Sequence, residues 1–178
     1  MSAQAVSPVR PETEVFLGIF RRHPAGVAVV TLRDPVLGHP VGFTATSVIS
    51  VSADPPTLAF SISRGSSSWP ALAAVASVVV NFLDHSAHEL SSRFATHGID
   101  RFAGVDWTEL DGGEPVLGRA SSWVRATILD RHPTADSALV VARIDHGAVG
   151  GEEPLVFYDR GYHRLRSVQP ATDRTAGR

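Results

Sequence analysis

The chain has 178 residues, of which 43% are hydrophobic and 19% charged, as is typical of one globular domain. Its formal net charge of −2 argues against a nucleic-acid-binding protein held by phosphate contacts. All sixteen basic residues are arginine and cysteine is absent, which excludes a Schiff-base or P-loop lysine, a disulfide, a thiolate nucleophile and an iron–sulfur cluster held by this chain.

The ends of the chain are predicted to be disordered, because residues 1–11 and 167–178 are polar and poor in large apolar side chains. Residues 12–166 contain no linker, repeat or composition break, and we expect them to form one domain. The N-terminus lacks the basic region and apolar core of a signal peptide, and no apolar run approaches the roughly 20 residues that span a bilayer. We therefore expect a cytoplasmic protein without membrane contact.

Periodicity predicts short helices among many strands. The segment ETEVFLGIF (residues 12–20) has apolar residues at helical spacing and is followed by a proline and a glycine. A second helix is expected after Ser67 or Ser68, which would cap it, and a third after Ser86, which has capping-box spacing to Glu89. Strands are expected at residues 26–32, 41–51, 57–63, 77–83, 115–132, 137–149 and 154–165.

The order of these elements favours an antiparallel sheet. Residues 26–32 and 41–51 are predicted to form a hairpin across the turn-rich segment RDPVLGHP. The segment ADPP then breaks the chain, because proline cannot donate to a sheet ladder. Since strands and helices do not alternate regularly, we predict a closed or nearly closed antiparallel barrel rather than a doubly wound sheet.

Common catalytic motifs are not found. None of the eight histidines lies in an HExxH or facial-triad pattern, and most stand beside proline, glycine or aspartate in expected loops, so no metal site is predicted. The serine-rich stretches lack the GxSxG motif of a hydrolase. The pair Glu152 and Glu153 lies in a glycine- and proline-containing turn and is expected to be solvated.

The stretch VGFTATSVISVSADPPTLAFSISRGSSSWP (residues 41–70) carries the strongest chemical signal, because small hydroxyl side chains interrupt its apolar strands. Small residues on an extended strand allow the edge of a flavin ring to approach, and that edge bonds to hydroxyl and backbone groups. An arginine followed by a serine cluster before a helix suits a phosphate. The same alternation is also typical of an ordinary half-exposed sheet.

This stretch, together with VVVNFL, SSRFA, DRFAGVDW, GEPVLGRASSWVRATI and PLVFYDRGYHRL, resembles successive motifs of the flavin reductase-like family over residues 16–165. The resemblance implies a mainly β fold, a six-stranded antiparallel FMN-binding split barrel with short flanking helices. It implies a homodimer whose second subunit builds part of the flavin site. It also implies an NAD(P)H-dependent reductase that supplies reduced FMN, or FAD, to a separate monooxygenase. Hydride would pass from nicotinamide C4 to flavin N5.

The resemblance also assigns binding positions, while no catalytic side chain is certain. His163 is the candidate for orienting the nicotinamide or the ring, and Asn81 has the alternative of satisfying backbone groups only. The assigned cofactor-binding residues are Thr44, Ala45, Thr46, Ser47, Ser50 and Val51 on one strand, Ser61, Ile62 and Ser63 on the next, Arg64, Ser66, Ser67 and Ser68 for the phosphate, and Asn81, Arg93, Phe94, Tyr162 and His163.

One segment departs from the family pattern. Members commonly carry Gly-Asp-His ahead of a strand, with the histidine on the nicotinamide side. Here the segment TADSALVVARI has Ala135 for the glycine and Ser137 for the histidine, and Ala142 replaces a strand glycine. Two alternatives therefore stay open. One is a flavin-binding barrel that has lost efficient NAD(P)H use and serves as a flavin or heme carrier or in another flavin-dependent reaction. The other is a barrel without flavin that acts as an interaction module.

Overall fold

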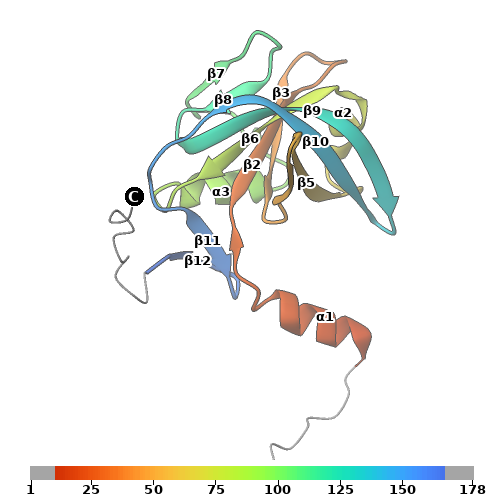
Figure 1. The fold of residues 1–178 in the computed structure, drawn as a ribbon, viewed down its shortest axis with the longest axis vertical. Helices are drawn as coiled ribbons and strands as arrows, with labels where there is room; N and C mark the ends of the chain where they lie inside the picture. The colour runs from red at the N-terminus through yellow and green to blue at the C-terminus, as the bar shows by residue number, and fades with distance from the viewer. Residues whose placement is uncertain (1–10, 167–178) are drawn as a thin grey trace, which may run out of the picture.

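The computed structural model describes residues 11–166, so the disorder predicted for the two ends falls almost wholly outside the described residues. Within this range seven antiparallel strands form the main sheet, in the order β3-β2-β6-β9-β10-β5-β4 (Figure 1). Their bounds are β2 Ala28–Arg33, β3 Pro40–Ala45, β4 Ile49–Ala53, β5 Pro56–Ser63, β6 Ser77–Leu83, β9 Ala120–Thr134 and β10 Ser137–Ala148. Because β3 and β4 end the order at opposite edges, the barrel is open, consistent with a split barrel.

Smaller elements cover the barrel. One small sheet has the order β1-β11-β12, and a two-stranded sheet pairs β7 with β8. The bounds are β1 Ala25–Gly26, β7 Trp107–Glu109, β8 Pro115–Leu117, β11 Leu155–Tyr158 and β12 Gly161–Arg164 for the strands, and α1 Glu12–Phe20, α2 Trp69–Ala74 and α3 His88–Ala95 for the helices. The three predicted helices and the predicted β2–β3 hairpin are confirmed.

Three predicted strands are wrong in extent. The stretch 41–51 divides after Ala45, and its halves β3 and β4 pair with β2 and β5 at opposite edges of the sheet. The stretch 154–165 is a hairpin that turns at Asp159 and Arg160, both at positive φ. The stretch 115–132 separates into β8 and β9. In each case the continuous apolar pattern did not reveal where the chain changes its pairing partner.

The predicted side-chain caps are also wrong. Helix α2 does follow Ser68, but the hydroxyl of Ser68 donates to the carbonyl of Gly42 and accepts no hydrogen bond from an N–H of its own helix. Helix α3 follows Ala87, and the backbone N–H of Ser86 donates to the carboxylate of Asp84. Ser68 therefore bonds to a segment distant in sequence, which a local pattern cannot predict, whereas Ser86 bonds to the nearby Asp84.

Strand β2 separates two hydrophobic clusters. Alternate side chains point to opposite faces of a strand, and here both faces are buried. One cluster fills the barrel and includes Val30, Phe60 and Leu72. The other lies beneath α3 and β11 and includes Phe94 and Leu155. The apolar strands β6 and β11 are thus covered by this chain itself.

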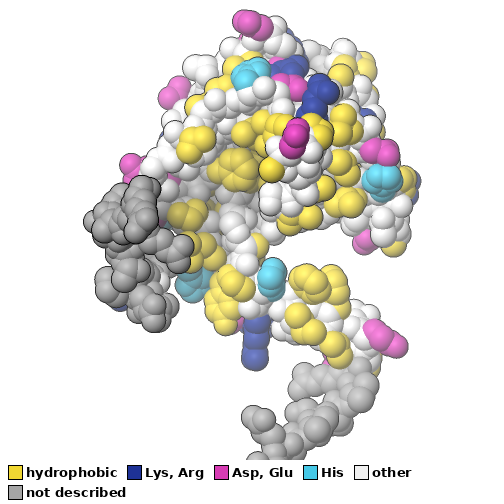
Figure 2. Space-filling model, in the orientation of Figure 1, with side chains coloured by type: hydrophobic (Ala, Val, Ile, Leu, Met, Phe, Trp, Pro, Cys, Tyr) yellow, Lys and Arg dark blue, Asp and Glu magenta, His cyan; other side chains and the backbone are white. Residues whose placement is uncertain are grey.

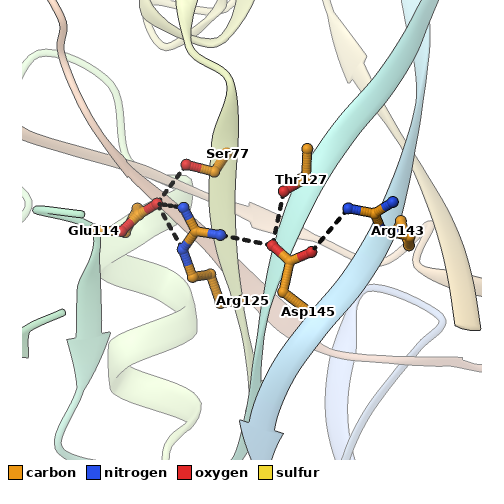
Figure 3. A network of polar contacts seen from close by, with 6 residues as sticks. All are labelled: Ser77, Glu114, Arg125, Thr127, Arg143 and Asp145. Carbon is orange, nitrogen blue, oxygen red and sulfur yellow. Dashed lines mark hydrogen bonds and ion pairs between the residues drawn. The ribbon is translucent and has the colours of Figure 1, made fainter. Parts of the chain in front are cut away.

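A charged network ties β6, the β7–β8 turn, β9 and β10 together (Figure 3). Its members are Ser77, Glu114, Arg125, Thr127, Arg143 and Asp145. Glu114 is only 2% exposed and accepts bonds from the Ser77 hydroxyl and the Arg125 guanidinium. Burial acts to raise the pKa of Glu114, but these donors outweigh it, and the pKa lies below its usual value.

Helix α1 stands apart from the barrel (Figure 1). All its side chains are exposed, and the apolar residues Phe16, Leu17, Ile19 and Phe20 are between 57% and 60% exposed. Its C-terminal end is held by Arg21, whose guanidinium donates to Asp159 in the β11–β12 turn. Among residues 11–166, no helix combines the length and apolar character needed to cross a membrane.

Candidate functional site

A pocket of about 480 Å³ opens where β3 and β5 end beside the C-terminus of α3. We call it the serine pocket. Its lining is Phe43, Thr44, Ser61, Ile62, Ser63, Gly65, Ser66, Phe94, Ala95, His97 and Arg101. Six residues assigned from the sequence thus meet in one place: Thr44, Ser61, Ile62, Ser63, Ser66 and Phe94. Among the described residues, none that lines this pocket carries a carboxylate, so no negative charge of the lining would repel an anionic ligand.

The turn after β5 shapes one wall of the serine pocket. The hydroxyl of Ser63 accepts a hydrogen bond from the N–H of Gly65, and its carbonyl accepts one from Ser66. These bonds fold the RGSSS segment back, so that Ser66 lines the pocket beside Ser63. Arg64 lies in the same turn with an exposed side chain, while its backbone N–H donates to the carbonyl of Asp136.

Arg101 is the charged group of the serine pocket, and sequence reasoning missed it. Its Nε donates to the carbonyl of Thr96, and its Nη1 donates to the carbonyl of Gly42 and the hydroxyl of Ser68. Its Nη2 makes one long contact, 3.5 Å, to the hydroxyl of Ser67. Burial lowers the pKa of Arg101, yet a guanidinium stays charged at neutral pH. The Nη2 edge is therefore the part free to bind an anion.

Arg93 and Phe94 support this arrangement from α3. The guanidinium of Arg93 donates to the carbonyls of Asp100, Arg101 and Ala103, so it holds the loop that presents Arg101. The ring of Phe94 is fully buried and meets Phe102 edge-on, with centroids 5.0 Å apart. Arg93 was assigned to the cofactor site from the sequence, and in the structure its bonds to these carbonyls position the loop.

Gly42 makes the close packing of α3 against β3 possible. A Cβ at this position would lie 2.6 Å from Cε1 of Phe94, closer than real Cβ atoms approach. The backbone of Gly42 also accepts bonds from Ser68 and Arg101. A side chain here would displace Phe94 from the pocket wall.

A second pocket, of about 330 Å³, lies on the other side of Arg101, and we call it the loop pocket. Its lining is His39, Pro40, Val41, Gly42, Ser67, Ser68, Gly98, Ile99, Asp100, Arg101 and Phe102. The predicted phosphate residues are thus divided, because Ser66 faces the serine pocket while Ser67 and Ser68 line the loop pocket.

A larger groove, of about 730 Å³, runs between α1 and the barrel, and we call it the helix groove. The predicted residues Thr46 and Ser47 line it, together with Phe16, Phe20 and others from α1. Figure 2 shows the hollow between α1 and the body, with hydrophobic side chains on both sides. Ser61 lines both the helix groove and the serine pocket. Its N–H donates to the Ser47 hydroxyl at 2.9 Å, and that hydroxyl donates to the Ser61 carbonyl at 3.2 Å.

Asn81 lies away from these pockets. It is fully buried, its amide donates to Val29 and Thr31, and its carbonyl oxygen accepts from the N–H of Leu117. This geometry gives no support to a cofactor contact and favours the alternative that Asn81 satisfies neighbouring backbone groups. Ala45 is likewise buried, 4% exposed, in the core.

The remaining assigned residues lie on other strands. Ser50 and Val51 are exposed on the edge strand β4. The hydroxyl of Tyr162 is 2.9 Å from that of Ser91, beneath α3. His163 is exposed, and its Nε2 lies 3.2 Å from the carbonyl of Tyr158. None of the pocket linings described above includes these four residues.

Ser137, where the family pattern has histidine, lies next to the serine pocket. It pairs with Ser63 across β10 and β5, and its hydroxyl donates to the carboxylate of Asp136. A side chain at position 137 therefore neighbours a pocket residue directly. Over residues 11–166, no three histidine, aspartate or glutamate side chains lie close enough together to hold a metal ion.

The fold and pocket together define a β-barrel protein suited to a phosphorylated aromatic ligand. The family model described as "Flavin reductase like domain" matches residues 20–166, and the chain belongs to this family. It is 43% identical over 150 residues to an NADH:FMN oxidoreductase of Rhodococcus erythropolis, covering 81% of this chain and 77% of that one. It is 31% identical over 163 residues to the flavin-dependent monooxygenase reductase subunit HsaB of Rhodococcus jostii (91% and 80% covered). A flavin reductase domain protein from Arthrobacter has a similar structure, with TM-score 0.84, 36% identity and coverage of 89% and 99%.

Proposed function

We propose that the protein is an NAD(P)H-dependent flavin reductase that supplies reduced FMN, or FAD, to a separate flavin-dependent monooxygenase. The observation that carries the proposal is the serine pocket, where strand hydroxyls and a desolvated arginine meet in a member of the flavin reductase-like family. Its volume of about 480 Å³ lies within the range of small-molecule sites, about 300–1,000 Å³.

The residues present fit a flavin mononucleotide. Thr44, Ser61 and Ser63 would lie along the ring edge, where hydroxyl and backbone groups can bond to its nitrogens and carbonyls. The Nη2 edge of Arg101, with Ser66 and Ser67, would hold the phosphate. A charge-assisted hydrogen bond from a partly buried arginine is stronger than one from a neutral donor.

A bound flavin would supply the redox chemistry, in which a hydride from nicotinamide C4 would reduce the flavin at N5 and NAD(P)H would be oxidised to NAD(P)⁺. The task of the chain is to hold the two rings in a reactive arrangement and to exclude water from them. Phe43 and Phe94 provide apolar walls for this purpose. The rest of the lining consists of hydroxyl and other small side chains, Ile62, His97 and Arg101.

The proposed partner is suggested by the relatives. HsaB is named as the reductase subunit of a flavin-dependent monooxygenase, and this chain covers 80% of its length. We therefore propose that this protein is also the reductase of a two-protein system in the cytoplasm. Reduced flavin would leave the pocket and bind to a separate oxygenase. A flavin-binding protein without efficient NAD(P)H use is the second candidate, and Ser137 in place of the family's histidine favours it.

A homodimer is part of the proposal. The apolar strands β6 and β11 are covered within the chain and need no partner. Instead α1 and the edge strand β4 expose their apolar residues, with Phe20 at 58%, Ile49 at 57% and Val51 at 55%. A second copy would cover these surfaces and close the helix groove beside Ser61.

The proposed function is tested by aerobic oxidation of NADH and of NADPH with FMN, FAD and riboflavin in turn. We expect oxidation of at least one nicotinamide that depends on added flavin, and slower turnover with riboflavin, which lacks the phosphate. Binding of FMN without oxidation of either nicotinamide would overturn the reductase and leave the second candidate. Absence of both binding and turnover would overturn both candidates.

A further inference from the structure

His97 and Arg101 are the two side chains of the serine pocket that can carry a positive charge. His97 is exposed, and it follows Thr96, the C-cap residue of α3. Within residues 11–166 its ring makes no hydrogen bond and no ion pair, unlike that of His132, whose Nε2 lies 3.1 Å from the carboxylate of Asp130. The imidazole of His97 is therefore available to a ligand in the pocket.

The backbone that carries His97 is fixed on both sides. The hydroxyl of Thr96 donates to the carbonyl of Ser92 at 2.8 Å, and its N–H donates to the carbonyl of Arg93 at 3.1 Å, so this residue is anchored to the last turn of α3. The carbonyl of Thr96 accepts a bond from Nε of Arg101 at 2.9 Å. The imidazole and the guanidinium thus approach the same pocket from two parts of one loop that are bonded to each other.

The free edge of one guanidinium does not balance the charge of a phosphate monoester. Nη1 of Arg101 is already bonded to Gly42 and Ser68, which leaves the Nη2 edge for an anion. A phosphate monoester carries a charge of about −1.5 to −2 at pH 7. Histidine side chains in general have a pKa of about 6.5 and are mostly neutral at pH 7, but a neighbouring anion favours the protonated form. An imidazolium beside Arg101 would supply the further positive charge.

We infer that His97 is a phosphate-binding residue of the serine pocket. Its imidazole takes up a proton from water when the flavin phosphate binds, and then donates an N–H to a phosphate oxygen. The inference rests on the proposed function, because it takes the flavin phosphate to lie at Arg101. The preference for FMN over riboflavin is then linked to protons, and it decreases as the pH rises from about 6.5 to 8.

Other charged or titratable side chains surround the serine pocket without lining it. They are His39 before β3, Arg64 in the turn after β5, His88, Glu89 and Arg93 on α3, Asp100 in the following loop, and Asp136 before β10. The phosphate itself titrates near pH 6. A test must therefore compare variants of His97 with wild type under the same conditions, above the pH at which the phosphate changes its charge.

Two variants separate the charge of His97 from its presence. His97→Gln removes the titrating group, and His97→Arg keeps a positive charge at every pH. The matched control is His132→Gln, because His132 is also an exposed histidine and lies outside the linings of the serine pocket, the loop pocket and the helix groove. For each protein, calorimetric titration with FMN and with riboflavin at pH 7, in two phosphate-free buffers of different ionisation enthalpy, gives the Kd and the number of protons taken up.

We expect wild type and His132→Gln to take up about half a proton for each FMN bound at pH 7, and no measurable proton with riboflavin. His97→Gln should lose this uptake and bind FMN about threefold more weakly, with the Kd of riboflavin unchanged. His97→Arg should also lose the uptake but keep the wild-type affinity for FMN.

Proton uptake that persists in His97→Gln would overturn the role of His97, and so would equal weakening of FMN and riboflavin in this variant. Binding of FMN to wild type without proton uptake would overturn it as well. In each of these cases flavin-dependent oxidation of NAD(P)H would leave the reductase standing. If wild type binds no flavin, both proposals are overturned.

Discussion

The serine pocket and the helix groove share Ser61 but are built in different ways. Around the serine pocket, the donors of Arg93 and Arg101 are engaged by backbone carbonyls and serine hydroxyls of the same chain. Around the helix groove, α1 has exposed apolar side chains and is held mainly through Arg21 at its end. One chain therefore provides the whole of the proposed phosphate site, whereas our proposal leaves the space beside the ring edge to be closed by a second copy.

The largest expected effect is on the free energy of unfolding. It concerns the buried carboxylate of Glu114, which lines neither the serine pocket nor the helix groove (Figure 3). Glu114→Ala would leave Arg125 without this partner, and removing one member of a buried pair costs about 3 kcal/mol or more. Denaturant unfolding at pH 7 measures the loss. Flavin affinity of the folded variant should stay unchanged, and a changed affinity would mean that the pocket depends on this network.

Glu114 also makes the free energy of unfolding depend on pH. The pKa of Glu114 is lowered in the folded protein, so its contribution to stability is fully present above the unfolded value of about 4.5. That contribution is lost as the pH falls through the lower folded pKa. Glu114→Gln should therefore show a weaker loss of unfolding free energy between pH 5 and pH 3 than wild type. Equal slopes for the two proteins would contradict the assigned direction.

The next largest effect is expected on the affinity of the serine pocket for FMN. Arg101→Ala removes a charged donor from the proposed phosphate site, worth about 2 kcal/mol, or roughly 30-fold in the Kd of FMN. Riboflavin affinity should change much less, because riboflavin has no phosphate. Arg143→Ala is the control for charge, since Arg143 is exposed on β10. Equal weakening of FMN and riboflavin would show that Arg101 only supports the fold of the loop.

The proposed dimer contact at the helix groove is tested by Phe20→Asp. Phe20 is 58% exposed, contacts Phe16 with ring centroids 4.6 Å apart and lines the helix groove. Burying a charge in its place should weaken a dimer about tenfold or more, or about 1.4 kcal/mol. Sedimentation velocity over a concentration series measures this, with Val36→Asp as the control. A wild-type monomer that binds flavin tightly would contradict the dimer.

The smallest effect concerns Ser137, which lies beside the serine pocket. Ser137→His restores a ring beside Ser63, and orientation of the nicotinamide should improve, raising kcat/KM for NAD(P)H about fivefold, or about 1 kcal/mol. Because Ser137 pairs with Ser63, a small change in flavin Kd is also expected. If the variant is slower than wild type, serine is adequate at this position and another residue orients the nicotinamide.

The sequence predicted the barrel because alternation and β-branched runs are local signals. β6 and β10 lie where their apolar residues indicated, and the β2–β3 hairpin follows from its turn residues. The division of residues 41–51 between two sheet edges was not predictable, since it depends on pairing with distant strands. Ser68 was expected to cap α2 but bonds to Gly42, a contact between residues far apart in sequence.

In the candidate site, the hydroxyl residues of the strands were predictable from the sequence, whereas the arginine was not. The hydroxyl residues of β3 and β5 were found because small side chains interrupt apolar strands, and Thr44, Ser61 and Ser63 do meet in one pocket. Arg101 was missed although the segment DRFAGVDW was recognised, because nothing local shows that its guanidinium reaches Gly42 and Ser68. Asn81, by contrast, was assigned to the cofactor site from the sequence, but its amide group bonds to Val29 and Leu117 within the core.

The most direct test of the central claim is a fluorescence titration of the wild-type protein with FMN and with riboflavin. If the serine pocket holds the ring and Arg101 holds the phosphate, FMN binding should saturate in the micromolar range or below, about −8 kcal/mol at 1 μM. Riboflavin should then bind at least tenfold more weakly. No quenching of FMN at roughly 100 μM, or equal affinity for the two flavins, would contradict the claim.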